Sequence, residues 1–322
     1  MSFGFSSALA DELAAFICYK RTVGYAYEHA LTHLRAFDQY CIGRGATSLD
    51  KDTVEGWLEL LLEKASPTST LSEISLIRQL GKYLYANGDT GAFVVPDKYC
   101  HRPRTVTPYL LSKVEIAEFF KAIGNYESIQ KGEMRKTVYF GLFQTMHACG
   151  IRCCEALRLA CKDVSFDDAA IDIIDSKGPK SRRLYITSEL VELLHRYDSE
   201  IDEYFPDRLA FFPNTSGGFP SISFIERGFN YIWDAAGLVR PEKGTMPNPY
   251  AFRHHFAFAN IARWAKEGRD VHSMMPYLMR YMGHSSYQST FYYIHLSPDM
   301  LADIPAQTQA LERVIPEVTF HD

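Results

Sequence analysis

Apolar residues recur at helical spacing through most of this 322-residue chain, and the period changes to that of a β-strand in one stretch. In AAIDIIDSKGPKSRRLYIT, residues 169–187, apolar and polar residues alternate on either side of a Gly-Pro step. This alternation predicts two short strands joined in a hairpin. We therefore expect a mainly α-helical fold with a small β-sheet inserted into it.

The helical part of the sequence is interrupted at residues 99–108. Four short segments with helical periodicity lie between Phe5 and about Gly88, and they predict a four-helix bundle. Residues 99–108 lose the periodicity and contain prolines and the cations Arg102 and Arg104, as an interdomain linker does. We expect one domain over residues 1–98 and a second over 109–322, which begins with a capping box at Ser112 and Glu115.

Composition excludes several classes of protein. The first residues lack a charged and apolar leader, and no apolar stretch is long enough to span a membrane, so a cytoplasmic protein without membrane contact is expected. Seven cysteines, an odd number, do not form a disulfide framework. The cluster His147, Cys149, Cys153 and Cys154 leaves a helical metalloenzyme as one alternative, but its spacing matches no common zinc pattern and we expect no metal.

The charge distribution leaves nucleic acid open as a partner. A net charge of −5 and a pI near 6.1 argue weakly against nucleic-acid binding, because many DNA-binding domains are strongly basic. The run KGPKSRR at 177–183 is nevertheless compactly basic. An acidic protein can therefore still present one basic face.

Three separate stretches carry polar residues where helix cores do not need them. GIRCCEAL places Arg152 at a helix start with Glu155 three residues on. PYAFRHHFAF places Arg253 inside an aromatic helix, and MGHSSYQSTFYYIH places His284 after a glycine. Taken singly, each has an ordinary structural explanation: an i,i+3 ion pair, a surface ion pair and a loop histidine.

Taken in order with the hairpin, these stretches resemble the tyrosine recombinase (phage integrase) family. Its catalytic domain carries an Arg in G-L/I-R-x-x-E-x-L-x-L, a hairpin Lys, H-x-x-R-H, and L-G-H with a Tyr nine residues after that His. The matching segments are GIRCCEALRL, DSKGPKSRR, YAFRH and MGHSSYQSTFYYIH, within about residues 110–300. The resemblance implies a simple Xer-like type with an N-terminal four-helix core-binding (SAM-like) domain and an α+β catalytic domain.

The chemistry of strand cleavage by a phenol suits these residue types. Negative charge develops on the non-bridging oxygens of the phosphodiester, where the forked, permanently charged guanidiniums of Arg152 and Arg253 can stabilise it. The resemblance implies that His284 adds a hydrogen bond to the same phosphate. Nine residues after His284 comes Tyr293, the implied nucleophile, whereas Tyr292 lies about 100° around a helix and is a packing or DNA-facing neighbour.

The hairpin supplies the remaining predicted contacts. The resemblance assigns the proton donor for the leaving 5′-oxygen to Lys177. The other hairpin cations, with the linker cations, are expected to bind DNA without reading its sequence. These residues are Lys180, Arg182, Arg183, Arg102 and Arg104. Glu155 matches a position that supports the first arginine.

The sequence departs from the family pattern at Tyr250, where the H-x-x-R-H motif usually begins with histidine. A phenol there can hydrogen-bond the phosphate but, with an ordinary pKa near ~10, is a poor general base at neutral pH. We retain Tyr250 as a catalytic residue. His254 lies one helical turn further on the same face and could compensate, although the resemblance gives its position a structural role. His255 is expected to face the core.

The resemblance implies an enzyme that cleaves and rejoins double-stranded DNA through a 3′-phosphotyrosine, without cofactor or metal, for a mobile element. The alternative is a catalytically impaired DNA-binding regulator on the same fold. We expect a homotetramer on paired sites, formed through exchange of the C-terminal tail, with possible accessory DNA-bending or co-recombinase proteins. A tail that folds back on its own protomer is equally compatible with the sequence.

Overall fold

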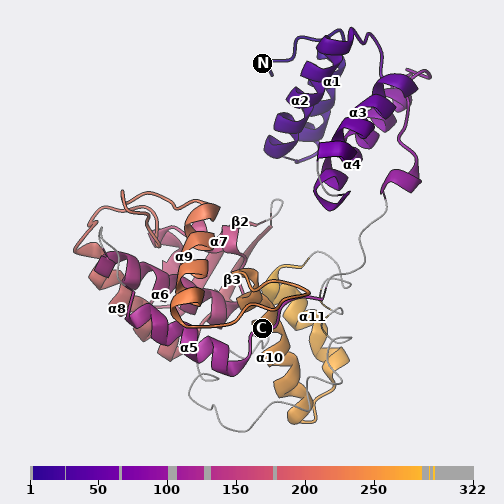
Figure 1. Cartoon of the computed structure of the whole chain (residues 1–322). Coiled ribbons are helices and arrows are strands. Elements are labelled where there is room, and N and C mark those ends of the chain that lie inside the picture. Colours follow the sequence, from indigo (N-terminus) through magenta and orange to yellow (C-terminus); the bar gives the residue numbers. More distant parts are fainter. Residues whose placement is uncertain are drawn as a thin grey trace. The chain divides into compact units, whose positions relative to one another are not determined.

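The structure is a computed structural model that describes residues 3–25, 27–64, 67–100, 107–126, 132–176, 180–284, 290 and 293 (Figure 1). It divides into two compact units, Met1–Thr105 and Val106–Asp322. Within the described ranges, no helix combines the length and the apolar character needed to cross a bilayer. The roles expected for the two domains stay predictions.

In its described part, the first unit contains four α-helices and a short 3-10 helix. These are α1 (Ala10–Thr22), α2 (Glu28–Arg44), α3 (Lys51–Lys64), α4 (Pro67–Ala86) and η1 (Asp97–Cys100). Asp50 caps α3 by accepting a hydrogen bond from the Thr53 backbone N–H at 2.8 Å. Phe16 and Phe37 are fully buried between the helices. The predicted helical fold of this part is confirmed.

The second unit combines helices with a small sheet (Figure 1). Its helices are α5 (Lys113–Gly124), α6 (Gly132–Cys149), α7 (Cys153–Leu157), η2 (Cys161–Asp163), α8 (Ser188–Asp202), α9 (Ile222–Ala235), α10 (Tyr250–Lys266) and α11 (Val271–Met282). The predicted capping box is present, since Ser112 Oγ accepts from the Glu115 N–H and the Glu115 carboxylate accepts from the Ser112 N–H.

The sheet has three antiparallel strands in the order β1 (Val164–Ser165), β2 (Ala170–Ser176) and β3 (Lys180–Tyr185). The sequence predicts the β2–β3 hairpin but not β1, because two residues are too few to show a period. In β3, Leu184 is buried and pairs with Ile171, while Arg182 pairs with Ile173. Alternation along the strand therefore turns Arg182 and Leu184 to one face and Arg183 to the other.

The helix expected after Gly150 is shorter than predicted. It ends at Leu157, and the chain then pairs with the segment that follows α8. The Phe211 N–H donates to Leu159 O, and the Cys161 N–H donates to Leu209 O. Tertiary hydrogen bonds thus replace the intrahelical ones over this stretch.

Helix α10 takes part in both hydrophobic clusters of the second unit. Its Phe252 packs with Phe119, Phe143 and Phe229 in the larger cluster. One turn later Phe256 belongs to a smaller cluster with residues of α11. The residue between these contacts, Arg253, is consequently held by packing on both sides.

Candidate active site

A left-handed turn at Gly150 positions the first predicted arginine. Gly150 has φ +58°, and a Cβ there would lie 2.4 Å from the Phe256 ring, so a side chain has no space. The turn ends α6 and leads to Arg152 at the N-cap of α7. The guanidinium thereby enters the site from a rigid corner between two helices.

Glu155 lies between two guanidiniums. Its carboxylate accepts from Arg152 Nη1 at 2.6 Å and from the Arg152 backbone N–H at 2.8 Å. It also accepts from Arg182 Nη1 and Nη2, at 3.0 and 2.8 Å, in a bidentate pair. The Glu155 side chain is only 3% exposed. Its charge therefore holds both arginines in place within a buried environment.

The three guanidiniums of the site also bind the end of α11. The last carbonyls of a helix lack intrahelical partners and carry partial negative charge, so they attract cations. Here three successive carbonyls each accept from a different arginine. The pairs are Arg182 Nε to Tyr281 O at 2.8 Å, Arg253 Nη2 to Met282 O at 2.7 Å and Arg152 Nη2 to Gly283 O at 2.6 Å.

Arg253 is the most deeply buried cation of this group. It is 3% exposed, and its Nη1 donates to Gly150 O at 2.6 Å. Burial, followed by the charge of Arg152, lowers the pKa of Arg253 to about 10, which leaves it charged at pH 7. The site thus concentrates positive charge at one corner of α10.

Gly283 closes α11 in the left-handed conformation, with φ +66°. A Cβ there would lie 2.9 Å from Arg182 Nη1, and this side chain cannot easily withdraw because Glu155 and Tyr281 O bind it. Gly283→Ala is therefore expected to lower the melting temperature and to disturb Arg182. The matched control is Gly237→Ala, since Gly237 has φ +67° and open space around its Cβ.

Both alanine variants incur the left-handed backbone cost of about 1–2 kcal/mol. Only Gly283→Ala adds the contact with Arg182, so its melting temperature should fall further, as measured by calorimetry on the two variants in parallel. Equal losses would contradict the close approach to Arg182.

His284 follows directly after Gly283. Its Nδ1 is hydrogen-bonded to Thr290 Oγ1 at 2.7 Å, and Thr290 is fully buried. Burial, and then the charges of Arg253, Arg152 and Arg182, lower the pKa of His284 to about 3. The imidazole is neutral at pH 7, and Thr290, which no sequence motif singled out, holds its orientation.

Tyr293 lies against α10. It is 3% exposed and packs in the cluster that contains Phe256, Trp264 and Met282. Its phenolic oxygen is 2.8 Å from His254 Nδ1, and the two atoms share a hydrogen bond. Tyr292 lies outside the described residues.

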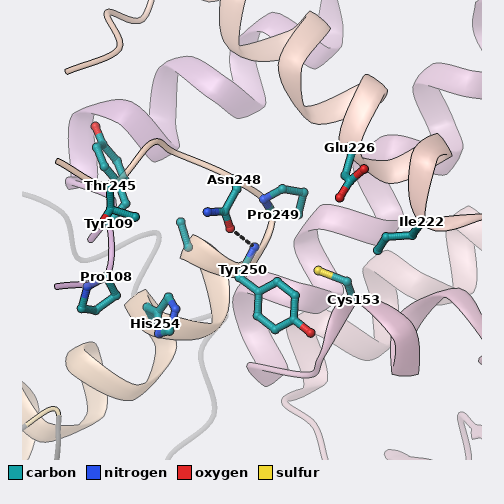
Figure 2. Close-up of a pocket in the computed structure, with 11 residues that line it drawn as sticks. Pro108, Tyr109, Cys153, Ile222, Glu226, Thr245, Asn248, Pro249, Tyr250 and His254 are labelled. Carbon is teal, nitrogen blue, oxygen red and sulfur yellow. Dashed lines mark hydrogen bonds between the residues drawn. The ribbon is translucent and has the colours of Figure 1, made fainter. Parts of the chain in front are cut away.

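Tyr250 begins α10 and lines a cleft of about 400 Å³ that also borders Cys153, Glu226 and His254 (Figure 2). The Tyr250 N–H donates to Asn248 Oδ1 at 2.9 Å, and Tyr250 is 43% exposed. Partial burial of the phenol is the main cause that raises the pKa of Tyr250. The phenol therefore keeps its proton at pH 7.

The two arginines of the hairpin lie on opposite faces of β3 and have different partners. Arg182 lies in the site, bound to Glu155, whereas Arg183 on the opposite face pairs with Asp172 at 2.8 and 2.9 Å. The alternation of β3 could have revealed this difference from the sequence. Lys180 lies on β3, where its backbone pairs with Ser176. Lys177, Arg102 and Arg104 lie outside the described residues.

The His/Cys cluster is part of the hydrophobic core. His147 and Cys149 are buried, and burial raises the pKa of the Cys149 thiol to about 12, which disfavours the thiolate that zinc binds. His255 hydrogen-bonds Leu111 O at 3.0 Å through its Nδ1. Within the described parts of the chain, no group of three or more His, Cys, Asp or Glu side chains is arranged to hold a metal.

Sequence comparisons identify relatives over most of the chain. The model of the phage integrase family matches residues 111–300. The protein y4rE of Sinorhizobium fredii, named provisionally as an integrase/recombinase, is 26% identical over 302 residues, which cover 92% of this chain and 95% of that one. The tyrosine recombinase XerC of Halalkalibacterium halodurans is 25% identical over 288 residues, which cover 86% and 88%.

Solved structures share the fold at lower identity. The Tn1549 transposon integrase in complex with transposon right end DNA superposes with a TM-score of 0.63 at 14% identity, covering 90% of this chain and 96% of that one. The XerH site-specific recombinase bound to difH in a post-cleavage complex gives a TM-score of 0.59 at 18% identity, covering 84% and 78%. These similarities confirm the predicted mainly helical fold with its small sheet.

Proposed function

The chain belongs to the phage integrase family of tyrosine-type site-specific recombinases, and from this premise we propose that it cleaves and rejoins DNA through a 3′-phosphotyrosine intermediate. The observation that carries the proposal is the meeting of segments far apart in sequence at the end of α11. The carbonyls of residues 281–283 at this helix end accept hydrogen bonds from Arg152, Arg182 and Arg253. His284 is the next residue along the chain.

Arg152 and Arg253 are proposed to bind the non-bridging oxygens of the scissile phosphate. Both are charged, forked donors held by contacts with protein carbonyls, so little reorganisation accompanies the transition state. Neutral His284 would donate a further hydrogen bond, because its Nδ1 is occupied by Thr290 and its Nε2 can carry the proton. Tyr250, whose phenol retains its proton, would act as a hydrogen-bond donor near the same phosphate.

Tyr293 is proposed as the nucleophile and Lys177 as the acid that protonates the leaving 5′-oxygen. Attack by the phenol would exchange one phosphoester for another, so the bond energy is conserved for rejoining. The reaction then needs no nucleotide cofactor. Arg183, Lys180, Arg102 and Arg104 remain proposed DNA-backbone contacts, and binding by Arg183 would require it to exchange Asp172 for phosphate.

Double-stranded DNA is the proposed partner, and a tetramer on paired sites is the proposed assembly. Lambda integrase has been solved as a tetramer bound to a Holliday junction, and the Tn1549 transposon integrase has been solved in complex with transposon right end DNA. These two structures motivate the assembly and the mobile-element context proposed here. We expect the mass measured by light scattering to rise to that of a tetramer on addition of substrate DNA. A stable tetramer without DNA would count against DNA-dependent assembly.

The alternative function is a regulator that binds DNA without cleaving it. Tyr250 is the observation that favours it, since a phenol replaces the usual histidine of the motif. The contacts of Arg152 and Arg182 with buried Glu155, and the burial of Arg253 beside them, favour the enzyme, because a regulator has no need to concentrate three guanidiniums in one site.

The test is covalent trapping on a nicked duplex carrying the sequence that the wild-type chain selects from a random DNA library. Cleavage beside the nick releases a short fragment, so rejoining fails and the adduct accumulates. A protease-sensitive adduct on a 3′-phosphate, with a free 5′-hydroxyl, is the expected result. Specific binding without an adduct would contradict the enzyme function and support the regulator.

A further inference from the structure

The hydrogen bond between His254 and Tyr293 points to the route by which the phenol loses its proton. We propose that His254 Nδ1 accepts the proton of the Tyr293 hydroxyl as the phenolic oxygen attacks phosphorus. This inference rests on the proposed recombinase function and adds to it the group that activates the nucleophile. It replaces the structural role that the family resemblance gave to this position.

The geometry places an acceptor directly on the reacting oxygen. His254 Nδ1 and Tyr293 Oη are 2.8 Å apart, within the range that proton transfer requires. The preceding residue, Arg253, is bound to Gly150 O and Met282 O, so the backbone that carries the imidazole is fixed from two sides. The distance is therefore set by the packing of α10.

The imidazole can hold the proton that it gains and release it again, because the ring borders a cleft. His254 is half-buried and lines the cleft that also contains Glu226 and Tyr250 (Figure 2). Because Nδ1 faces Tyr293 and accepts its hydrogen bond, the proton of the neutral ring is on Nε2. A proton taken up at Nδ1 makes both nitrogens donors, and the ring can return it during rejoining, when the phenol is the leaving group.

The protonation state of His254 suits an acceptor. Burial, and then the charge of Arg253, lowers the pKa of His254 to about 4, so the ring is neutral at pH 7. Several charged or titratable groups face His254. Arg253 precedes it, Tyr293 binds it, and His284 lies close enough to interact with it electrostatically. Tyr109, Cys153, Glu226 and Tyr250 line the same cleft, whereas Arg152, Glu155 and Arg182 act on Arg253.

Tyr250 is less suited to the same task. Its pKa is raised above that of an ordinary phenol, so it has no free base form at pH 7. Its hydroxyl points away from His254 in the view of Figure 2, on the side where Cys153 lies. The two side chains share the cleft but present their polar ends to different parts of it.

The step balances without a co-reactant. The O–H bond of Tyr293 breaks and its proton goes to His254 Nδ1, while the phenolic oxygen forms a bond to phosphorus. The bond from phosphorus to the 5′-oxygen breaks with its electron pair on oxygen, which takes a proton from Lys177. Rejoining reverses each transfer, so His254 ends neutral and Lys177 ends protonated.

The experiment compares single-turnover cleavage of the nicked duplex by the wild-type chain, His254→Asn and the matched control His255→Asn. Asparagine keeps a hydrogen-bond acceptor near the place of Nδ1 but has no basicity, and His255, next on the same helix, contacts Leu111 O instead of Tyr293. Because the general base is lost, the cleavage rate of His254→Asn is expected to be lower than that of the wild-type chain by about 10²-fold or more at pH 7. The cleavage rate of His255→Asn should be close to wild type.

Two further readouts separate proton acceptance from positioning. The wild-type rate should be independent of His254 ionisation above about pH 5, while the His254→Asn rate should rise about tenfold per pH unit as phenolate forms. Incorporation of 3,5-difluorotyrosine at position 293 lowers the phenol pKa and should restore most of the cleavage rate of His254→Asn. A positioning role alone would produce neither effect.

The outcomes also separate this inference from the function on which it rests. An adduct formed by the wild-type chain establishes the recombinase chemistry whatever the variants do. A His254→Asn rate within a few-fold of wild type, or a loss that neither pH nor fluorination restores, would overturn His254 as the acceptor. A wild-type chain that binds the duplex and forms no adduct would overturn both.

Discussion

Tyr293→Phe is expected to abolish the covalent DNA adduct completely, while specific DNA binding is retained. The substitution removes only the phenolic oxygen, so no atom remains at this position that can form a bond to phosphorus. The ring continues to fill its place beside Phe256 and Met282. Trapping on the nicked duplex, followed by denaturing electrophoresis, measures the adduct directly.

The control for this variant is Tyr292→Phe, which removes a phenol one residue earlier and should retain the adduct. Loss of the hydrogen bond to His254 is expected to change the free energy of unfolding of Tyr293→Phe by only about 1 kcal/mol. A melting temperature close to wild type would therefore show that the lost adduct reflects chemistry and not unfolding. An adduct that survives in Tyr293→Phe and disappears in Tyr292→Phe would reverse the assignment of the nucleophile.

Glu155→Ala is expected to have the largest effect on stability. Its carboxylate binds Arg152 and Arg182, whose side chains are 16% and 12% exposed, so removing it leaves two largely buried guanidiniums without their shared counter-ion. Breaking a buried ion pair by deleting one partner costs about 3–5 kcal/mol. The charge of Arg253 nearby adds to the repulsion.

The same substitution should reduce cleavage even in the molecules that remain folded. Arg152 would lose the contact that aims its guanidinium, and loss of one oriented donor to a transition-state oxyanion costs about 10²–10³-fold in rate. Calorimetry and single-turnover trapping at a temperature well below the transition measure the two effects separately.

Asp172→Ala is the matched control for Glu155→Ala, because it removes an arginine partner from the exposed face of the same hairpin. Asp172 pairs with Arg183, and both side chains are accessible to water. Solvent screens such a pair, so the melting temperature should change little. Similar losses in the two variants would contradict the special role of the buried carboxylate.

Local patterns were sufficient to predict most of the secondary structure. The helices of both units follow their apolar periodicity, and the capping box at Ser112 depends on residues three apart. The misses have a common cause. Strand β1 and the early end of α7 depend on hydrogen bonds to Ile171, Leu209 and Phe211, which no local pattern contains.

The order and spacing of short motifs were likewise sufficient to propose the main site residues. Arg152, Arg253, His284 and Tyr293 are chemically distinctive residues at fixed intervals, and the count of nine from His284 selects one tyrosine of an adjacent pair. Chemical identity and distance along the chain are both properties that a sequence displays directly.

Tertiary structure decided which partners these residues have. Each of the three arginines donates to one backbone carbonyl of residues 281–283, and a carbonyl carries no sequence signal because every residue has one. Thr290, Arg182 and His254 gain their places only when β3, α10 and the segment after α11 pack together. The contacts that would orient the phosphate ligands and activate the nucleophile arise from packing between distant segments, which local periodicity and motif spacing do not encode.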